Sequence, residues 1–242
     1  MSIPGLAILS SLLAIFVPIA CADTISLGSF ATGTTAGSLG FSASETAMNF
    51  AGYTAFSSPP AVASTPALQS GTASTYALSP GGAWAGPIGN STWIGSTPQS
   101  GPGGVSPAYG YYQFNTAFTA GETGPYSGSI DVMGDDTVQV LLNGVVIVPF
   151  APLGSDAHCA DTGPTCSGGD IVALDGVSLL SGADANTLTF IVEQAGDIGS
   201  GSDPSGLDFS MTLAAAPEPG SLLLLGTGLL AGAALLLRRR LA

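Results

Sequence analysis

The distribution of basic residues constrains this sequence more than any other feature. The 242-residue chain has three lysines and arginines in all, and they are the consecutive residues Arg238, Arg239 and Arg240. Exposed helix faces normally carry Lys, Glu and Arg, so the sequence argues against a helical bundle or a coiled coil. The chain also has 35 glycines and 17 prolines, and 45% of it is hydrophobic. This combination predicts an all-β chain with turns rich in Gly and Pro.

The acidic residues have almost no basic partners. Residues 23–216 contain fifteen Asp and Glu, one His and no Lys or Arg. No basic patch therefore exists in this region to neutralise phosphates. Nucleic acid is not expected as a partner, because its affinity comes largely from Lys and Arg that displace counterions.

The N-terminus has the features of an export signal. Residues 3–20 form an apolar run that is followed by Ala20-Cys21-Ala22, which fits an A-x-A cleavage site. We expect residues 1–22 to be a signal helix that signal peptidase removes, with Ala20 and Ala22 marking the cleavage site and Asp23 starting the mature chain. The alternative is a lipoprotein with an acylated Cys21, although Pro18 stands where the lipobox usually has Leu.

The C-terminus predicts a single transmembrane helix. Ser221 to Leu237 is a charge-free run of 17 residues, and about 17 to 25 suffice to span a bilayer. Arg238, Arg239 and Arg240 follow at once as a membrane stop and should remain on the cytoplasmic side. The predicted topology places the ectodomain outside and a short tail inside.

The same region resembles a known sorting signal. Pro217-Glu218-Pro219, a Leu/Gly/Ala helix and a closing Arg cluster, in this order, resemble the PEP-CTERM protein-sorting signal of bacteria over residues 217–242. The resemblance implies an exosortase as partner, with Pro217, Glu218 and Pro219 as its recognition residues. It implies a chain that is anchored in the cell-envelope membrane before processing and located at the surface or in the extracellular matrix afterwards. The alternative is a plain C-terminal anchor with a Pro-containing linker.

Residues 23–216 are expected to form one antiparallel β-sandwich. Alternation with period two runs through 112–118, 137–142, 187–192 and 207–213, and Asn143-Gly144 predicts a type I′ hairpin. Short strands with one apolar face and frequent turns are typical of such sandwiches. Residues 57–107 interrupt the pattern as an irregular insertion rich in Ser, Pro and Gly.

The order of these segments carries a second, looser resemblance. Residues 93–94, 111–118, 129–144, 186–192 and 204–209 are together similar to galactose-binding-like jelly rolls of secreted bacterial proteins. The resemblance implies a jelly-roll ectodomain that binds carbohydrate through loops at one end, in some members with a structural calcium. The sequence lacks the Arg that often contacts sugar hydroxyls in that fold.

Two groups of side chains are candidate ligand residues. Asp131, Asp135 and Asp136 are predicted calcium ligands, because hard cations take carboxylate oxygens from turns; solvated turn carboxylates are the alternative. Trp84, Trp93 and Tyr109 are predicted to stack on sugar rings, and the alternative is that they close the open end of the core.

The mature chain retains two cysteines, Cys159 and Cys166, which flank a turn-rich hexapeptide. An even number of cysteines in an exported chain predicts a disulfide between them. The competing interpretation takes both, with His158 and a nearby Asp, as zinc ligands, although no second Cys pair or second His is present.

These features favour a non-enzymatic protein that binds or organises exopolysaccharide outside the cell. No catalytic residue and no cofactor other than a structural calcium are predicted. The alternative is a secreted carbohydrate-active hydrolase that uses Asp or Glu. Adjacent Asp135 and Asp136 do not by themselves establish it, since glycosidases need two carboxyls across a cleft.

Overall fold

The computed structural model describes residues 23–33, 46–58, 60, 62–121, 124–152, 170–182, 185–195, 203–216, 226–233 and 238. Residues 23–216 form a compact unit of their own. The described strands are β1 (Thr24–Ala31), β2 (Thr46–Ala55), β3 (Ala73–Ser74), β4 (Tyr76–Ala77), β5 (Ile94–Gly95), β6 (Gly110–Phe118), β7 (Pro125–Asp135), β8 (Thr137–Leu142), β9 (Val145–Val148), β10 (Asp170–Ser178), β11 (Asn186–Gln194) and β12 (Gly206–Ala215). The predicted all-β character of the ectodomain is confirmed.

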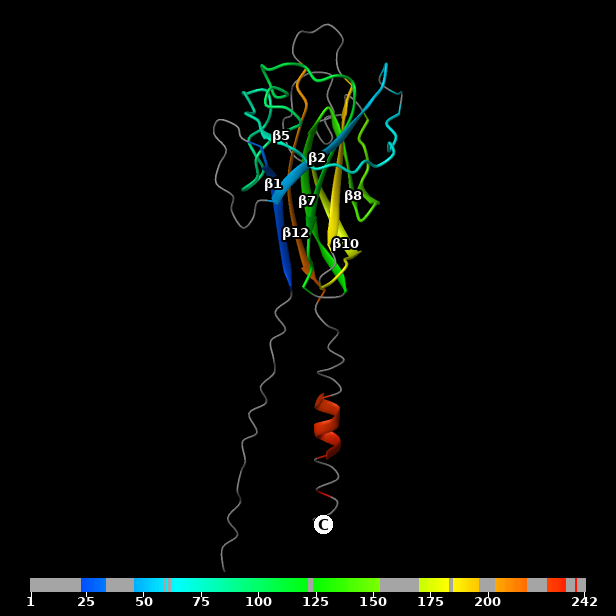
Figure 1. The fold of residues 1–242 in the computed structure, drawn as a ribbon. Helices are drawn as coiled ribbons and strands as arrows, with labels where there is room; N and C mark the ends of the chain where they lie inside the picture. The colour runs from blue at the N-terminus through cyan, green and yellow to red at the C-terminus, as the bar shows by residue number, and fades with distance from the viewer. Residues whose placement is uncertain are drawn as a thin grey trace, which may run out of the picture. The chain divides into compact units, whose positions relative to one another are not determined.

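The long strands form two facing layers (Figure 1). The first sheet has the order β10-β7-β12-β1, and the second has the order β2-β6-β11-β8-β9. β1 and β2 join them along one side, and β7 continues into β8 from one sheet to the other. The result is a β-sandwich, as the alternating apolar pattern predicts.

One strand pair departs from the antiparallel expectation. β1 pairs with β12 in antiparallel register through Gly28, but from Ser29 to Ala31 it pairs with β2 in parallel. A parallel pair needs a crossover connection of about a dozen residues, and the segment between β1 and β2 is long enough for one. The other pairs of long strands are antiparallel.

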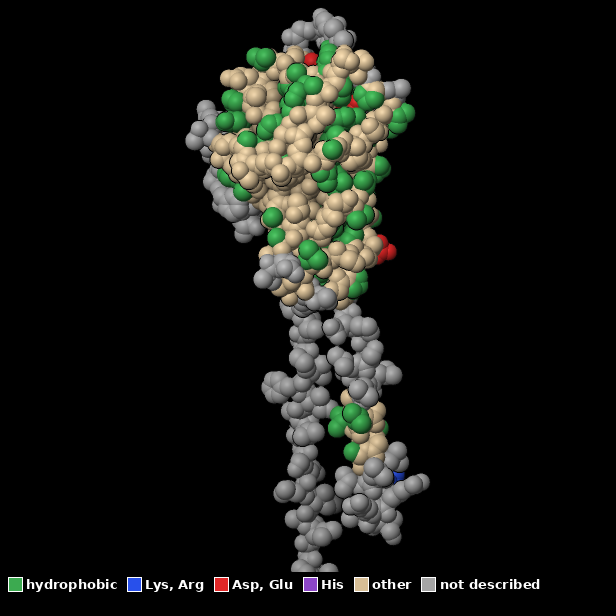
Figure 2. Space-filling model, turned by 45° about the vertical axis from the view of Figure 1, so that its right-hand side comes forward, with side chains coloured by type: hydrophobic (Ala, Val, Ile, Leu, Met, Phe, Trp, Pro, Cys, Tyr) green, Lys and Arg blue, Asp and Glu red, His purple; other side chains and the backbone are tan. Residues whose placement is uncertain are grey.

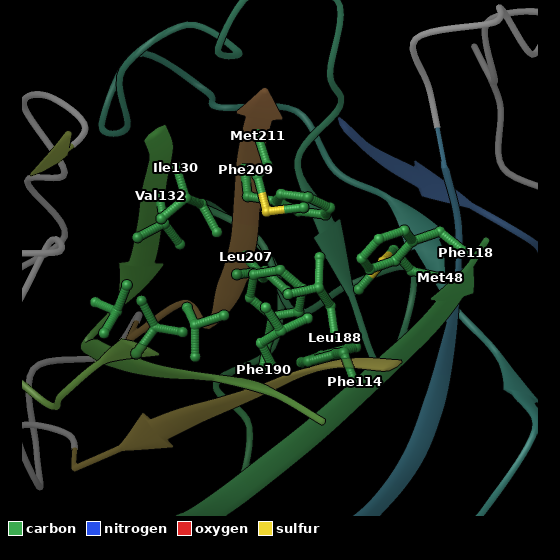
Figure 3. Packing of buried hydrophobic residues seen from close by; sticks show 14 of the residues in the cluster. Met48, Phe114, Phe118, Ile130, Val132, Leu188, Phe190, Leu207, Phe209 and Met211 are labelled. Carbon is green, nitrogen blue, oxygen red and sulfur yellow. The ribbon is translucent and has the colours of Figure 1, made fainter. Parts of the chain in front are cut away.

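The main core lies between the two sheets. Figure 3 shows Phe114, Leu188 and Phe190 of the second sheet facing Leu207, Phe209 and Met211 of the first. The rings of Phe190 and Phe209 have centroids 4.4 Å apart. Alternation therefore assigned the inward residues of β6, β11 and β12 correctly, because side chains at every second position share one face of a strand.

The hairpin between β8 and β9 also follows the prediction. Asn143 has φ of 50° and Gly144 has φ of 80°. A type I′ turn requires positive φ at both central residues, and Asn-Gly tolerates this conformation best. The predicted turn type is confirmed.

The irregular segment covers the outer faces of the sandwich. Gln69 exchanges two hydrogen bonds with Gln113 of β6, and Thr65 donates to Gln139 of β8 at 2.6 Å. The part that follows β4 packs Trp84 and Trp93 over Met133 of β7. Apart from β3, β4 and β5, no strand occurs in the described part of residues 57–107, in line with an excursion over the sheets.

Both ends of the ectodomain lie at one end of the sandwich. The Ala215 N–H donates to the Asp23 carbonyl at 2.8 Å, and the Ala216 N–H donates to the Pro125 carbonyl at 2.9 Å. β7 starts at Pro125 and runs for 11 residues to Asp135. At about 3.3 Å per residue, Asp135 lies roughly 30 to 35 Å from the chain ends.

The C-terminal segment is described only at residues 226–233, which are helical, and at Arg238. No helix among the described residues is long and apolar enough to cross a bilayer. The rest of the predicted span 221–237 lies outside the described residues.

Candidate functional site

The candidate site lies where the chain passes from β7 to β8, at the end of the sandwich opposite Asp23 and Ala216. Asp135 ends β7 opposite Gly206 of β12. The Asp136 N–H donates to the Glu193 carbonyl on β11 at 3.0 Å, and the Asp135–Asp136 peptide bond is cis. Asp135 and Asp136 therefore lie at the junction of the two sheets.

Asp135 is held by an aromatic side chain. Only 1% of Asp135 is exposed, and its Oδ2 accepts a hydrogen bond from Trp84 Nε1 at 2.6 Å. Hydrogen bonds to an ionised acceptor are short and strong. The indole therefore fixes the orientation of this carboxylate.

Asp136 is held by the backbone. It is 2% exposed, and its Oδ2 accepts the Ala195 N–H at 2.6 Å. This bond ties the β7–β8 junction to the residue that follows β11. The carboxylates of Asp135 and Asp136 are therefore anchored by different elements, one through a loop and one through the second sheet.

Glu193 is a third buried carboxylate, which sequence reasoning missed. It is fully buried, and neither of its carboxylate oxygens has a hydrogen-bond partner in the structure. Burial, and secondarily the charge of Asp136, raises the pKa of Glu193 to about 7. One feature of the sequence could have identified Glu193: it is an acidic residue within the strand 186–194, in a domain that has no Lys or Arg to pair with it.

Asp131 lies apart from the pair. It is half-buried on β7, four residues before Asp135. Four strand residues span about 13 Å. Because calcium–oxygen distances are about 2.4 Å, Asp131 cannot share one ion with Asp135. The structure separates the predicted set of three into a pair and a distant residue.

The described residues do not contain a complete metal centre built from side chains. No three His, Cys, Asp or Glu side chains among them come together as metal ligands. A cation at Asp135 and Asp136 would have to take its other ligands from backbone oxygens, water or a bound molecule. Calcium accepts such mixed oxygen sets, commonly with six to eight ligands.

The two tryptophans are part of the structure's interior. Trp84 is 4% exposed and Trp93 is not exposed, and their rings stack with centroids 4.3 Å apart. Neither ring offers a free face to a sugar, and neither closes the end of the main core, because both pack with Leu78 and Met133 in a separate cluster on the outer face of the first sheet. Tyr109 is half-buried, and its carbonyl accepts the hydroxyl hydrogen of Tyr53.

The loop that carries Trp84 is fixed by another buried carboxylate. Asp208 of β12 is fully buried and accepts hydrogen bonds from Ser29 Oγ at 2.7 Å and from the Ile88 N–H at 2.8 Å. Burial raises the pKa of Asp208 to about 6, and hydrogen bonds from Ser91, Ser29 and the backbone oppose the shift. Asp208 thus ties residues 88–91 to the outer face of the first sheet.

Several predicted residues lie outside the described residues: Ala20, Ala22, His158, Cys159, Cys166, Pro217, Glu218, Pro219, Arg239 and Arg240. The signal-peptide cleavage and the disulfide therefore stay predictions. Arg238 is described and exposed. Figure 2 shows one face of the ectodomain, where uncharged side chains and backbone predominate and few acidic groups are visible.

Residues 215–240 match a known family, the PEP-CTERM protein-sorting motif. The sorting signal predicted from Pro217-Glu218-Pro219 and the Arg cluster is thereby confirmed. A sorting motif of this kind supports the interpretation that the protein is sorted to the surface by an exosortase. No curated protein matches the sequence.

Two solved structures are similar to part of the chain, and both are beta-glucosidase from Kluyveromyces marxianus. The complex with glucose is 16% identical and the Se-Met labeled form 18%, each with a TM-score of 0.28. The similarity covers 47% of this chain and 11% or 12% of the enzyme chains. This chain therefore spans about a tenth of their length, and so distant a likeness supports no assignment of activity.

Proposed function

We propose that this protein is an exported surface or extracellular-matrix protein that is sorted by an exosortase and that binds or organises exopolysaccharide without catalysing a reaction. The sorting motif at residues 215–240 supports the route. Signal peptidase would remove residues 1–22, and the run 221–237 would hold the precursor in the membrane until processing. The jelly-roll-like sandwich would carry the binding function.

The observation that carries this proposal is the position of the site relative to the chain ends. Asp23 and Ala216 are bonded to neighbouring strand ends at one end of the sandwich, while Asp135 and Asp136 lie at the other. A domain attached through Ala216 leaves the opposite end clear of its own attachment. Ligands in the surrounding matrix would approach that end.

We also propose that calcium binds at Asp135 and Asp136. Both side chains offer hard oxygen ligands, and Glu193 beside Asp136 is buried with no partner for either oxygen. A buried ionised carboxylate is costly unless it is paired. The ectodomain has no Lys or Arg for this purpose, so a bound cation is the partner that fits the chemistry of these residues.

Calcium would also explain how such a domain holds a saccharide without arginine. Sugar hydroxyls are neutral oxygen ligands and can complete a coordination shell of six to eight oxygens. A divalent cation would equally bridge an acidic polysaccharide to a protein of formal net charge −13. The two carboxylates would hold the ion, and the ion would supply the contact to the ligand.

The hydrolase alternative has less support. A glycosidase needs an acid and a second carboxylate that both reach the substrate across a cleft. Asp135 and Asp136 are instead adjacent residues, and each accepts a hydrogen bond at its Oδ2, from Trp84 Nε1 and from the Ala195 N–H respectively. No arrangement in the described residues favours a hydrolytic reaction.

A glycan array tests the proposal. The ectodomain, residues 23–216, should be applied with calcium and, in parallel, with a chelator. The proposal predicts binding to at least one class of polysaccharide fragment in calcium and loss of the signal in chelator. Cleavage of the bound glycans would support the hydrolase instead.

A further inference from the structure

We infer that Trp84 is a positioning residue that orients Asp135 for the cation. The inference rests on the proposed calcium site and extends it to a side chain that touches neither the ion nor the saccharide. Its starting point is the hydrogen bond of 2.6 Å from Trp84 Nε1 to Asp135 Oδ2. The indole N–H occupies one acceptor position of the carboxylate and thereby fixes the plane of the group.

Trp84 can fix Asp135 because Trp84 is itself immobilised. Its ring stacks on Trp93 at an interplanar angle of 23°, and both rings pack in one buried cluster with Leu78 and Met133. The backbone N–H of Trp84 donates to the Pro80 carbonyl at 3.0 Å. Packing in this cluster therefore fixes the rotamer of the indole, and the backbone bond fixes the turn that carries it.

The strand beneath Trp84 is shaped to admit the ring. Gly206 lies opposite Asp135 on β12, and a Cβ at this position would stand 2.6 Å from Trp84 Cη2. Only glycine leaves enough room for the ring here. Asp135, Gly206 and Trp84 therefore form one packed unit, built from β7, β12 and the loop before β5.

The loop is tied down a second time, away from Asp135. Trp93 Nε1 donates to the Ala85 carbonyl at 2.9 Å, and Asp208 accepts the Ile88 N–H. These bonds hold the residues that follow Trp84. They also supply a matched comparison, because Trp93 is an equally buried indole whose hydrogen bond does not reach a carboxylate of the site.

Two single substitutions in the ectodomain test the inference. Trp84→Phe removes the N–H donor and keeps an aromatic ring in the stack, and Trp93→Phe does the same at the comparison position. Calcium titration by calorimetry should show affinity about tenfold weaker for Trp84→Phe, as expected for loss of a hydrogen bond to a charged group. Trp93→Phe should bind calcium like the wild type.

Fluorescence gives a readout that does not depend on the affinity of Trp84→Phe. The chain has two tryptophans, so Trp93→Phe leaves Trp84 as the sole emitter. Calcium should shift the emission of Trp93→Phe, because the ion would change the electrostatic field at the indole of Trp84. Calcium should leave the emission of Trp84→Phe unchanged.

Each outcome decides a different point. Equal calcium affinities for the two variants, with no emission shift in Trp93→Phe, would overturn the role of Trp84 and leave the calcium site intact. Absence of calcium binding by the wild type would instead overturn the calcium site and the inference that rests on it. The processing and the glycan binding of the protein would remain to be judged by their own experiments.

Discussion

The carbonyl of Asp23 accepts a hydrogen bond from the N–H of Ala215 at 2.8 Å. The first residue of the expected mature chain is thus joined to the strand that leads into the sorting motif. Asp23 Oδ2 also accepts hydrogen bonds from the Gly121 N–H and from the Tyr126 hydroxyl, each at 2.8 Å. The folded domain therefore begins and ends where the sequence places its two processing signals.

The mature protein should consist of the folded domain with little added at either end. We expect intact-mass analysis of the protein from its native host to show a chain that starts at Asp23 and lacks Ser221–Ala242. Replacing Pro217, Glu218 and Pro219 with alanine should leave the tail attached. Finding Ser221–Ala242 on most wild-type molecules would contradict exosortase processing.

Trimming should not unfold the domain, because its core lies entirely within residues 23–216.

Glu193 should make the stability of the calcium-free ectodomain depend on pH. Its pKa is raised from 4.5 to about 7, so the folded state takes up a proton more readily than the unfolded state. This contribution is therefore fully present below about pH 4.5 and is lost as pH rises through about 7. Thermal melts in chelator should show wild-type stability increasing as pH falls from 8 to 5.

Glu193→Gln is the matched variant, since it keeps the size of the side chain and removes the charge. At pH 8 it should melt about 2 to 4 °C higher than the wild type, the shift that 1 kcal/mol gives in a domain of this size. Its melting temperature should vary less between pH 8 and pH 6. Identical pH profiles for the two proteins would show that Glu193 is not a buried charge in solution. Asp208, whose pKa is raised to about 6, contributes in the same direction at lower pH.

Gly206→Ala should damage both the packing and the calcium site. The added Cβ would displace the Trp84 ring, and overpacking of this kind typically costs about 1 to 3 kcal/mol. Gly86→Ala is the control, because nothing lies within 4 Å of a Cβ at Gly86. Chemical denaturation and calcium titration of both variants check the prediction. If Gly206→Ala and Gly86→Ala had equal stability and equal calcium affinity, the Trp84 ring would not need the space above Gly206.

The sequence predicted the sandwich better than the site. Alternation identified the inward faces of β6, β8, β11 and β12, since Phe114, Leu188 and Phe209 occur at every second position with turn residues between the strands. It did not predict the parallel pairing of β1 with β2, because strand order depends on long-range contacts that no local pattern encodes.

The carboxylate site depends on similar long-range contacts. Trp84 and Asp135 are 51 positions apart, and nothing in either segment signals their hydrogen bond. Glu193 was missed for a different reason. On the sequence it occupies an outward strand position, which is normally solvent-exposed, and only the folded chain shows that this face is covered.

The central claim is that the end of the sandwich carrying Asp135 and Asp136 binds polysaccharide through calcium. Its most direct test measures, in calcium, the affinity of the strongest array glycan for three proteins: the wild type, Asp136→Asn and Asp175→Asn. Asp175 is the control, an exposed carboxylate of β10 that accepts a hydrogen bond from Ser127 Oγ near the chain ends. We predict that Asp136→Asn weakens binding at least about tenfold, as loss of a charged ligand does, while Asp175→Asn has no effect. Equal binding by all three proteins, or no binding by the wild type with calcium present, would contradict the account.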